Sequence, residues 1–332
     1  MAIGGGTGTD GKYYRLEADL TGAESITQPL GNNSDKAFMG HFDGGGHTIN
    51  LNITGNYENS GLFATVGPSL ATWGAGNGSV KNLKLTGTVN VSGSNVKYAG
   101  SVACSISDDV NSNVTFISGI ANSVTVTASG PMALGVGGIA GLASSDYIEN
   151  CYSTGNVSIV NTGGEGVSAG GIIGSSVSPI RYCWASGAVT ASNKTSAVGN
   201  SNSSSGGIYG SGEAGEISHC AALNPAVSGD NSLFEFFVSG AFRVGADFMT
   251  TGGNLTFTNN YANSAMTVNG AVPTDYKAHN DRNGADVTLS ATEAADGDWW
   301  KTTAGWSSRF GTSETAPWKW DSASKRPVLW FE

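Results

Sequence analysis

The sequence predicts an all-β protein, a right-handed parallel β-helix (solenoid) that ends in a C-terminal aromatic-rich capping segment. Three observations support this prediction: two patterns alternate along the chain, the segments between turn residues are short and β-branched, and the tryptophans gather near the C-terminus. The 332 residues include 50 glycines, and only 13% are charged against 39% hydrophobic. Disordered chains carry more charge and fewer branched apolar residues, so this composition indicates a folded, turn-rich protein.

The first pattern is a pair of glycines, an aliphatic residue, a variable residue and another glycine. Its clear copies span residues 137–141, 170–174 and 206–210, and looser copies begin at Gly61, Gly100 and Gly240. Short alternating segments such as residues 124–127 and 157–160 lie between the copies, and none has a helical period. A short strand cannot bury its apolar side alone, so we expect successive units to stack as coils.

The second pattern has an aliphatic head, a small residue three positions later, often a glycine seven positions later and an aliphatic residue nine positions later. Clear copies begin at Val80, Ile148, Ile180 and Ile217, and weaker copies at Ile120 and Phe257. The heads lie 28 to 40 residues apart, which indicates a constant strand core with loops of variable length.

Three of the four cysteines occupy the same position of the second pattern. These are Cys151, Cys183 and Cys220, and their predicted counterparts in the other copies are Leu83, Ser123 and Asn260. A thiol packs as a small apolar group, so we expect an internal column of small side chains rather than a redox or metal site.

Residues 1–270 are predicted to form the β-helix repeats with an N-terminal first coil, and residues 271–332 a Trp-rich cap that continues the solenoid. Two interpretations of the tail tryptophans stay open: they close the last coil, or they form an exposed platform for sugar rings. The candidate glycan-binding residues are Trp299, Trp300, Trp306, Trp318 and Trp320, and Trp330 completes the cluster.

The glycine-aliphatic-glycine units at residues 138–141 and 171–174 resemble the GLUG motif of bacterial cell-surface proteins, which are adhesin-like repeat proteins. Residues 42–49 are similar to the first coil of such proteins, and residues 259–263, 318–321 and 327–330 to their C-terminal end. The resemblance implies a parallel β-helix on a secreted or outer-surface protein, often a lipoprotein, and it carries no shared catalytic residues.

One loop offers a candidate metal site. It is dense in oxygen ligands of the kind calcium prefers: Asp108, Asp109, Asn111 and Asn113. Such loops are also ordinary turns, so we expect no cofactor, with calcium as the alternative.

The charge pattern limits the partners. The formal net charge is −10 and the basic residues form no row, which disfavours nucleic acid. No apolar stretch is long enough to span a bilayer, so a membrane is expected only through a lipid anchor, and an export signal is expected to have been removed. We expect an extracellular or outer-surface location.

These observations predict a non-catalytic binding or adhesion scaffold that recognises glycans, or host or bacterial surface proteins. The alternative is a carbohydrate-active β-helix enzyme, similar to a polysaccharide lyase or hydrolase, with a site assembled from loops far apart in the sequence.

Overall fold

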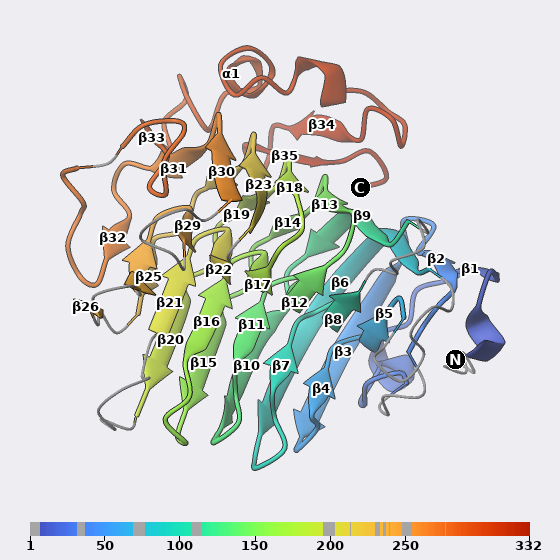
Figure 1. The fold of residues 1–332 in the computed structure, drawn as a ribbon. Coiled ribbons are helices and arrows are strands. Elements are labelled where there is room, and N and C mark those ends of the chain that lie inside the picture. The colour runs from blue at the N-terminus through green and yellow to red at the C-terminus, as the bar shows by residue number, and fades with distance from the viewer. Residues whose placement is uncertain are drawn as a thin grey trace.

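Short strands wind into a parallel β-helix in the computed structural model of this chain (Figure 1). The structure describes residues 7–31, 37–68, 77–107, 114–194, 203–212, 214–229, 233–234, 237–238, 240–247, 254–275 and 277–332. The solenoid has about five turns, which confirms the predicted fold class. Its coils succeed one another from the N-terminal strands to the last coil, and the C-terminal segment then runs back along one side (Figure 1).

Each coil contributes strands to three sheets. One coil runs through β9 (Phe116–Asn122) and β10 (Thr125–Gly130) of the large sheet, then β11 (Gly135–Gly137), then β12 (Ala140–Ser144). The next coil returns to the large sheet with β13 (Tyr147–Glu149), which pairs in parallel with β9. The chain therefore passes the same three sheets once per coil.

The large sheet also contains β1 (Tyr13–Arg15), β2 (His41–Asp43), β3 (Thr48–Gly55), β6 (Ser79–Ser92), β14 (Tyr152–Ser153), β15 (Val157–Asn161), β18 (Ile180–Arg181), β19 (Trp184–Ala185), β20 (Val189–Asn193), β23 (Ala214–Ser218), β24 (Ala221–Ala222), β25 (Ala226–Ser228), β30 (Asn254–Thr258), β31 (Tyr261–Asn263), β32 (Thr267–Val268) and β33 (Ala285–Val287). With β11, the second sheet contains β4 (Asn59–Ser60), β7 (Tyr98–Ala99), β16 (Val167–Gly170), β21 (Ser203–Gly206) and β28 (Ala241–Phe242). With β12, the third contains β5 (Phe63–Val66), β8 (Ala103–Ser107), β17 (Ile173–Ser176), β22 (Tyr209–Gly212) and β29 (Gly245–Asp247). The remaining described elements are two hairpins, one helix and three short 3-10 turns. The hairpins are β26 (Leu233–Phe234) with β27 (Phe237–Val238) and β34 (Trp318–Asp321) with β35 (Arg326–Leu329). The helix is α1 (Gly297–Thr302), and the 3-10 turns lie at Thr7–Thr9, Gly22–Glu24 and Ser307–Arg309.

The core consists of columns of branched side chains that point into the solenoid. One column of the large sheet pairs, coil by coil, Ile53, Val89, Val126, Val157, Val189 and Val227. All six are buried. Because side chains alternate between the two sides of a strand, the residues between these positions face outward.

The glycine pairs of the first pattern form the tight corner between the second and third sheets. A Cβ atom on Gly171 would lie 2.0 Å from the carbonyl oxygen of Gly207 in the next coil, and one on Gly137 would lie 2.0 Å from that of Ala140. Only a residue without a side chain allows the backbone to approach so closely. The repeated glycines are therefore a packing requirement of the corner.

The strand register corrects one copy of the second pattern. Ile148 pairs with Ile117, so Ile117 heads that copy and the prediction of Ile120 was wrong. Ile120 instead pairs with Leu83 and takes the place assigned to Ser123. The preceding corner residue has positive φ in each copy, and here it is Gly119. The sequence from Ile120 to Ser123 imitates the pattern three residues too late.

The cysteine column lies inside, as predicted. Cys151, Cys183 and Cys220 are at most 1% exposed and unpaired by disulfides. Asn260 ends the column, where its amide nitrogen donates to the carbonyl oxygen of Ile217 at 2.7 Å. Burial raises the pKa of the Cys151 and Cys220 thiols well above the usual range.

A buried arginine helps to close the last coil. Arg243 is fully buried, and its guanidinium donates to the carbonyl oxygens of Asn283 at 3.0 Å and Gly284 at 2.7 Å and pairs with Asp286. Strand β33 adds to β31 beside this loop. Residues 277–287 thus stay with the solenoid, whereas the following segment leaves it.

Replacing Gly171 with alanine is expected to destabilise the protein by about 1–3 kcal/mol or more, because the new methyl group meets backbone that cannot move aside. Gly8→Ala is the matched control, since nothing lies within 4 Å of the added atom. Thermal and urea unfolding of both variants measures the difference. Equal stability of the two would contradict the corner packing.

The cysteines are expected to resist thiol reagents in the native protein and to react once it is unfolded. The buried thiols are inaccessible, and the raised pKa of Cys151 and Cys220 leaves little reactive thiolate at those two residues. Ellman's reagent, added before and after guanidinium, counts the reactive thiols. Fast labelling of Cys151 or Cys220 in the native state would show that the column is not packed.

Candidate binding face

The outward side of the large sheet carries ladders of small, uncharged side chains, all of them polar except Val160. The central ladder pairs, coil by coil, Thr54, Asn90, Thr127, Ser158, Thr190 and Ser228. The flanking ladders are Asn52, Thr88 and Thr125 on one side and Ser92, Ser129, Val160 and Ser192 on the other. We call the residues of these three ladders the polar face.

The polar face is the outer side of the same strands whose inner side supplies the branched core column. In β10, for example, Val126 points inward while Thr125 and Thr127 point outward. Neighbouring hydroxyls lie close: Ser158 Oγ is 3.4 Å from Thr127 Oγ1. The spacing between coils, about 4.8 Å, therefore sets the spacing of the hydroxyl groups.

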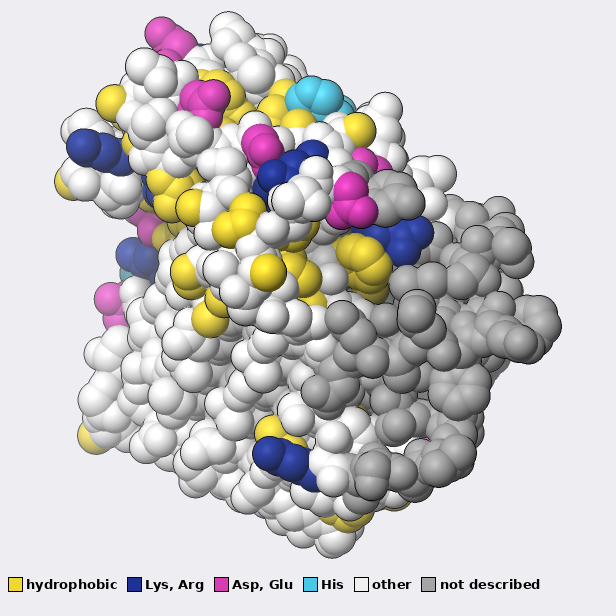
Figure 2. Space-filling model, turned by 90° about the vertical axis from the view of Figure 1, so that its left-hand side faces the viewer, with side chains coloured by type: hydrophobic (Ala, Val, Ile, Leu, Met, Phe, Trp, Pro, Cys, Tyr) yellow, Lys and Arg dark blue, Asp and Glu magenta, His cyan; other side chains and the backbone are white. Residues whose placement is uncertain are grey.

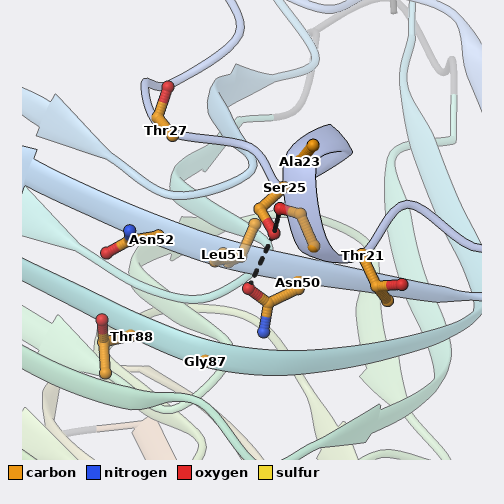
Figure 3. A pocket seen from close by; sticks show the side chains of 10 residues that line it. Thr21, Ala23, Ser25, Thr27, Asn50, Leu51, Asn52, Gly87 and Thr88 are labelled. Atoms are coloured by element: carbon orange, nitrogen blue, oxygen red, sulfur yellow. Dashed lines mark hydrogen bonds between the residues drawn. The ribbon is translucent and has the colours of Figure 1, made fainter.

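A groove opens at the N-terminal end of the polar face (Figure 3). It has a volume of about 530 Å³ and lies between the 3-10 turn at Gly22–Glu24 and strands β3 and β6. Its polar lining consists of Thr21, Ser25, Thr27, Asn50, Asn52 and Thr88. Two of these, Asn52 and Thr88, belong to the polar face, so the groove and the face are continuous.

Asn50 is held in place at the centre of the groove. Its Oδ1 lies 3.0 Å from the Ser25 hydroxyl, and its amide nitrogen donates to Thr86 Oγ1 at 3.0 Å. Asn52 and Thr88 are exposed and make no side-chain hydrogen bond to another described residue. The groove thus presents fixed and free hydrogen-bonding groups side by side, which suits a ligand rich in hydroxyl groups.

The groove and the polar face are electrically neutral. None of the described residues that line the groove or form the three ladders is ionisable. An anionic ligand would find no cation to pair with here, and a charged protein surface would lose hydration without gaining a partner. The face therefore favours an uncharged ligand.

Charged side chains gather elsewhere on the large sheet. Arg309 lies beside Glu149 at 3.5 Å, and Arg181 pairs with Glu216 at 2.8 Å. Burial raises the pKa of Glu149, against the effect of the nearby Arg309. On the side of the molecule that Figure 2 shows, most of the charged side chains lie in the upper part. Each carboxylate of this cluster has an arginine partner, which suits a structural ion-pair network.

The predicted tryptophan platform lies mostly inside the protein. Trp300, Trp306 and Trp318 are at most 1% exposed, Trp299 is 7% exposed and Trp320 is half-buried. Trp306 packs against Trp300 and Trp318, with ring centroids 4.7 and 5.0 Å away. Stacking on sugars needs an exposed ring face, and the buried rings do not offer one.

The C-terminal segment of residues 288–332 is a strap across the outer side of the large sheet. The indole nitrogen of Trp306 donates to the carbonyl oxygen of His219 at 2.9 Å, and that of Trp184 donates to the carbonyl oxygen of Pro327 at 3.2 Å. At the far end, Glu314 pairs with Lys81 at 2.9 Å. The strap thus runs across one side of several coils (Figure 1), whereas the sequence predicts a cap over the last coil.

The predicted calcium ligands Asp108, Asp109, Asn111 and Asn113 lie outside the described residues. Among the residues that are described, no group of three or more His, Cys, Asp or Glu side chains is arranged to hold a metal ion. No helix in the described part of the chain is long and apolar enough to cross a membrane.

Sequence reasoning missed the groove and the polar face. A signal was present in the alternation of Thr88, Val89, Asn90 and Val91, which places polar groups on one side of a strand. The ladders themselves join residues from different coils, and loops of unequal length hide their register.

The fold and the face together define a parallel β-helix whose large sheet carries a neutral polar face. A crystal structure of a Bacteroides ovatus protein, provisionally described as an immunoglobulin A1 protease, is similar: the match has a TM-score of 0.63 and 21% identity, and covers 96% of this chain and 86% of that chain. At this identity the likeness shows the fold alone. A scan of protein-family models and a search of curated proteins each find no match.

Replacing Trp306 with alanine is expected to destabilise the protein by about 3–5 kcal/mol, because the change empties a packed site between strap and sheet. Tyr13→Ala is the control, since Tyr13 is an aromatic residue that is 83% exposed. Thermal melting and size exclusion measure stability and aggregation. A wild-type melting temperature for Trp306→Ala would show that the strap does not hold the coils.

Proposed function

We propose that this protein is a non-catalytic binding scaffold, secreted or displayed at a bacterial surface, and that it recognises uncharged glycans. The observation that carries the proposal is the continuity of the groove with the polar face. The β-helix fold supports the general class, since it fits a surface or secreted β-helix protein.

The chemistry of the groove favours a glycan over a protein partner. Protein interfaces rely on buried aromatic and arginine anchors at their centre. The described lining offers instead hydroxyl and amide groups, and its apolar side chains are Ala23 and Leu51. Sugar hydroxyls both donate and accept hydrogen bonds, and Asn50, Asn52 and Thr88 match both roles.

The strap gives such a scaffold rigidity. It contacts the large sheet from Tyr261, whose hydroxyl donates to the carbonyl oxygen of Thr303 at 2.9 Å, to Lys81 near the N-terminal end. A rigid face loses little conformational entropy when it binds, so weak polar contacts add up more effectively.

The test is binding to a panel of polysaccharides by affinity electrophoresis. Wild-type protein is expected to bind at least one neutral polymer among mannan, xyloglucan, arabinoxylan and mixed-linkage β-glucan, and to bind polygalacturonate, alginate and heparin more weakly. The variant Asn52→Glu/Thr88→Glu should lose at least about tenfold in affinity, since each carboxylate must be desolvated in a neutral groove.

The control is Thr256→Glu/Thr258→Glu, which adds the same charge at exposed positions of β30, outside the polar face. It should bind as the wild type does. If the wild-type protein binds none of the neutral polymers, the proposal is refuted. New reducing ends or unsaturated sugars during incubation, or cleavage of immunoglobulin A1, would favour an enzyme instead.

A further inference from the structure

We infer that the polar face is a linear track for a single extended polysaccharide chain, which starts in the groove and crosses the coils along the solenoid axis. This inference rests on the proposed function and adds the shape and direction of the ligand. The occupant is an uncharged polymer of sugars.

The central ladder gives the track its direction. Its six residues belong to six successive strands, from β3 at the groove to β25, and each is Thr, Ser or Asn. The strand spacing is about 4.8 Å, so equivalent hydroxyl or amide groups recur at that interval along the axis. A ligand that crosses the coils therefore meets the same kind of hydrogen-bonding group at each step. A polymer of repeating sugars can use such a repeated surface along its whole length.

The side chains of the ladder are short, and their geometry is fixed. Threonine is stiff at χ1, and the hydroxyl contact of Ser228 with Thr190, at 3.2 Å, limits the remaining freedom. Thr54, Asn90 and Thr190 are exposed, while Thr127, Ser158 and Ser228 are partly buried. The result is a low surface with donors and acceptors along its length.

Charge matching excludes the other extended polymers. The described ladders contain no cation for a nucleic acid or an acidic polysaccharide, whose affinity depends on such contacts. Charged residues of the sheet lie in other columns, where Arg15 and Asp43 pair in register and Glu149 pairs with Arg181. A neutral chain suits the neutral columns.

The groove anchors one end of the chain. It is the place where the ligand is enclosed on more than one side, because the turn at Gly22–Glu24 rises beside Asn50 and Asn52 (Figure 3). Beyond it the face is open, so each further sugar adds a weak contact. The contacts become effective because the anchored chain is already at high local concentration.

The test measures how affinity depends on the length of the oligosaccharide and on where along the track a substitution lies. Oligosaccharides of increasing length, cut from the neutral polymer that binds best, are titrated by calorimetry against wild type, Asn52→Glu/Thr88→Glu and Ser158→Glu/Thr190→Glu. The last variant changes strands β15 and β20, and β20 lies roughly 14 Å from β6 at the spacing of neighbouring strands. Thr256→Glu/Thr258→Glu is again the control for charge, and thermal melting confirms that each variant is folded.

For the wild type, affinity per chain is expected to rise at least about tenfold from the shortest bound oligosaccharide to the polymer. Ser158→Glu/Thr190→Glu should bind short oligosaccharides as the wild type does, but its affinity should not rise with ligand length. Asn52→Glu/Thr88→Glu should lose affinity for short oligosaccharides and for the polymer. If Ser158→Glu/Thr190→Glu keeps wild-type affinity for the polymer, the track is refuted while the proposed function stands. If the wild type binds no neutral glycan at any length, or if only a protein ligand is found, both fail.

Discussion

Backbone hydrogen bonding between successive coils is the constraint on which the rest of this structure depends. The parallel pairing of each strand with the strand one coil away fixes every residue above its counterpart. A column must then be uniform in kind, because an inward polar group would be buried beside apolar neighbours at strand spacing. The column from Ile53 to Val227 is uniform in this sense, and the column from Thr54 to Ser228 is uniform on the outer side.

The same constraint explains how much the sequence predicts. The glycine corners and the cysteine column were predictable because their residues occupy a fixed place in a repeated pattern. Their physical cause is visible at Gly171, where a Cβ atom would meet the carbonyl oxygen of Gly207. The copy at Ile117 was misplaced because Gly119 and Ile120 offered a second, false match, which only the pairing of Ile117 with Ile148 resolves.

The groove and the course of the strap were beyond prediction for a different reason. Asn52 and Thr88 become neighbours only through the register of β3 with β6, and Thr21 joins them through a turn that is not part of the repeat. The tryptophans were visible as a group, but their partners are Tyr152, Tyr182 and His219, which lie in other coils. An aromatic cluster in the sequence does not tell which surface it will cover.

The strap and the polar face divide the outer side of one sheet between them. Where outward residues are large and aromatic, as at Tyr152 and Trp184 with ring centroids 4.7 Å apart, the strap covers them and gains hydrophobic burial. Where outward residues are small and polar, covering them would cost hydration with little apolar area in return, so they stay open. Stacking of the coils then makes the open surface periodic, because each coil adds one more hydroxyl or amide at the same position along its strand. A single such group binds weakly against water, and repetition along a rigid axis is the physical route by which a neutral surface gains affinity for a chain that repeats as well.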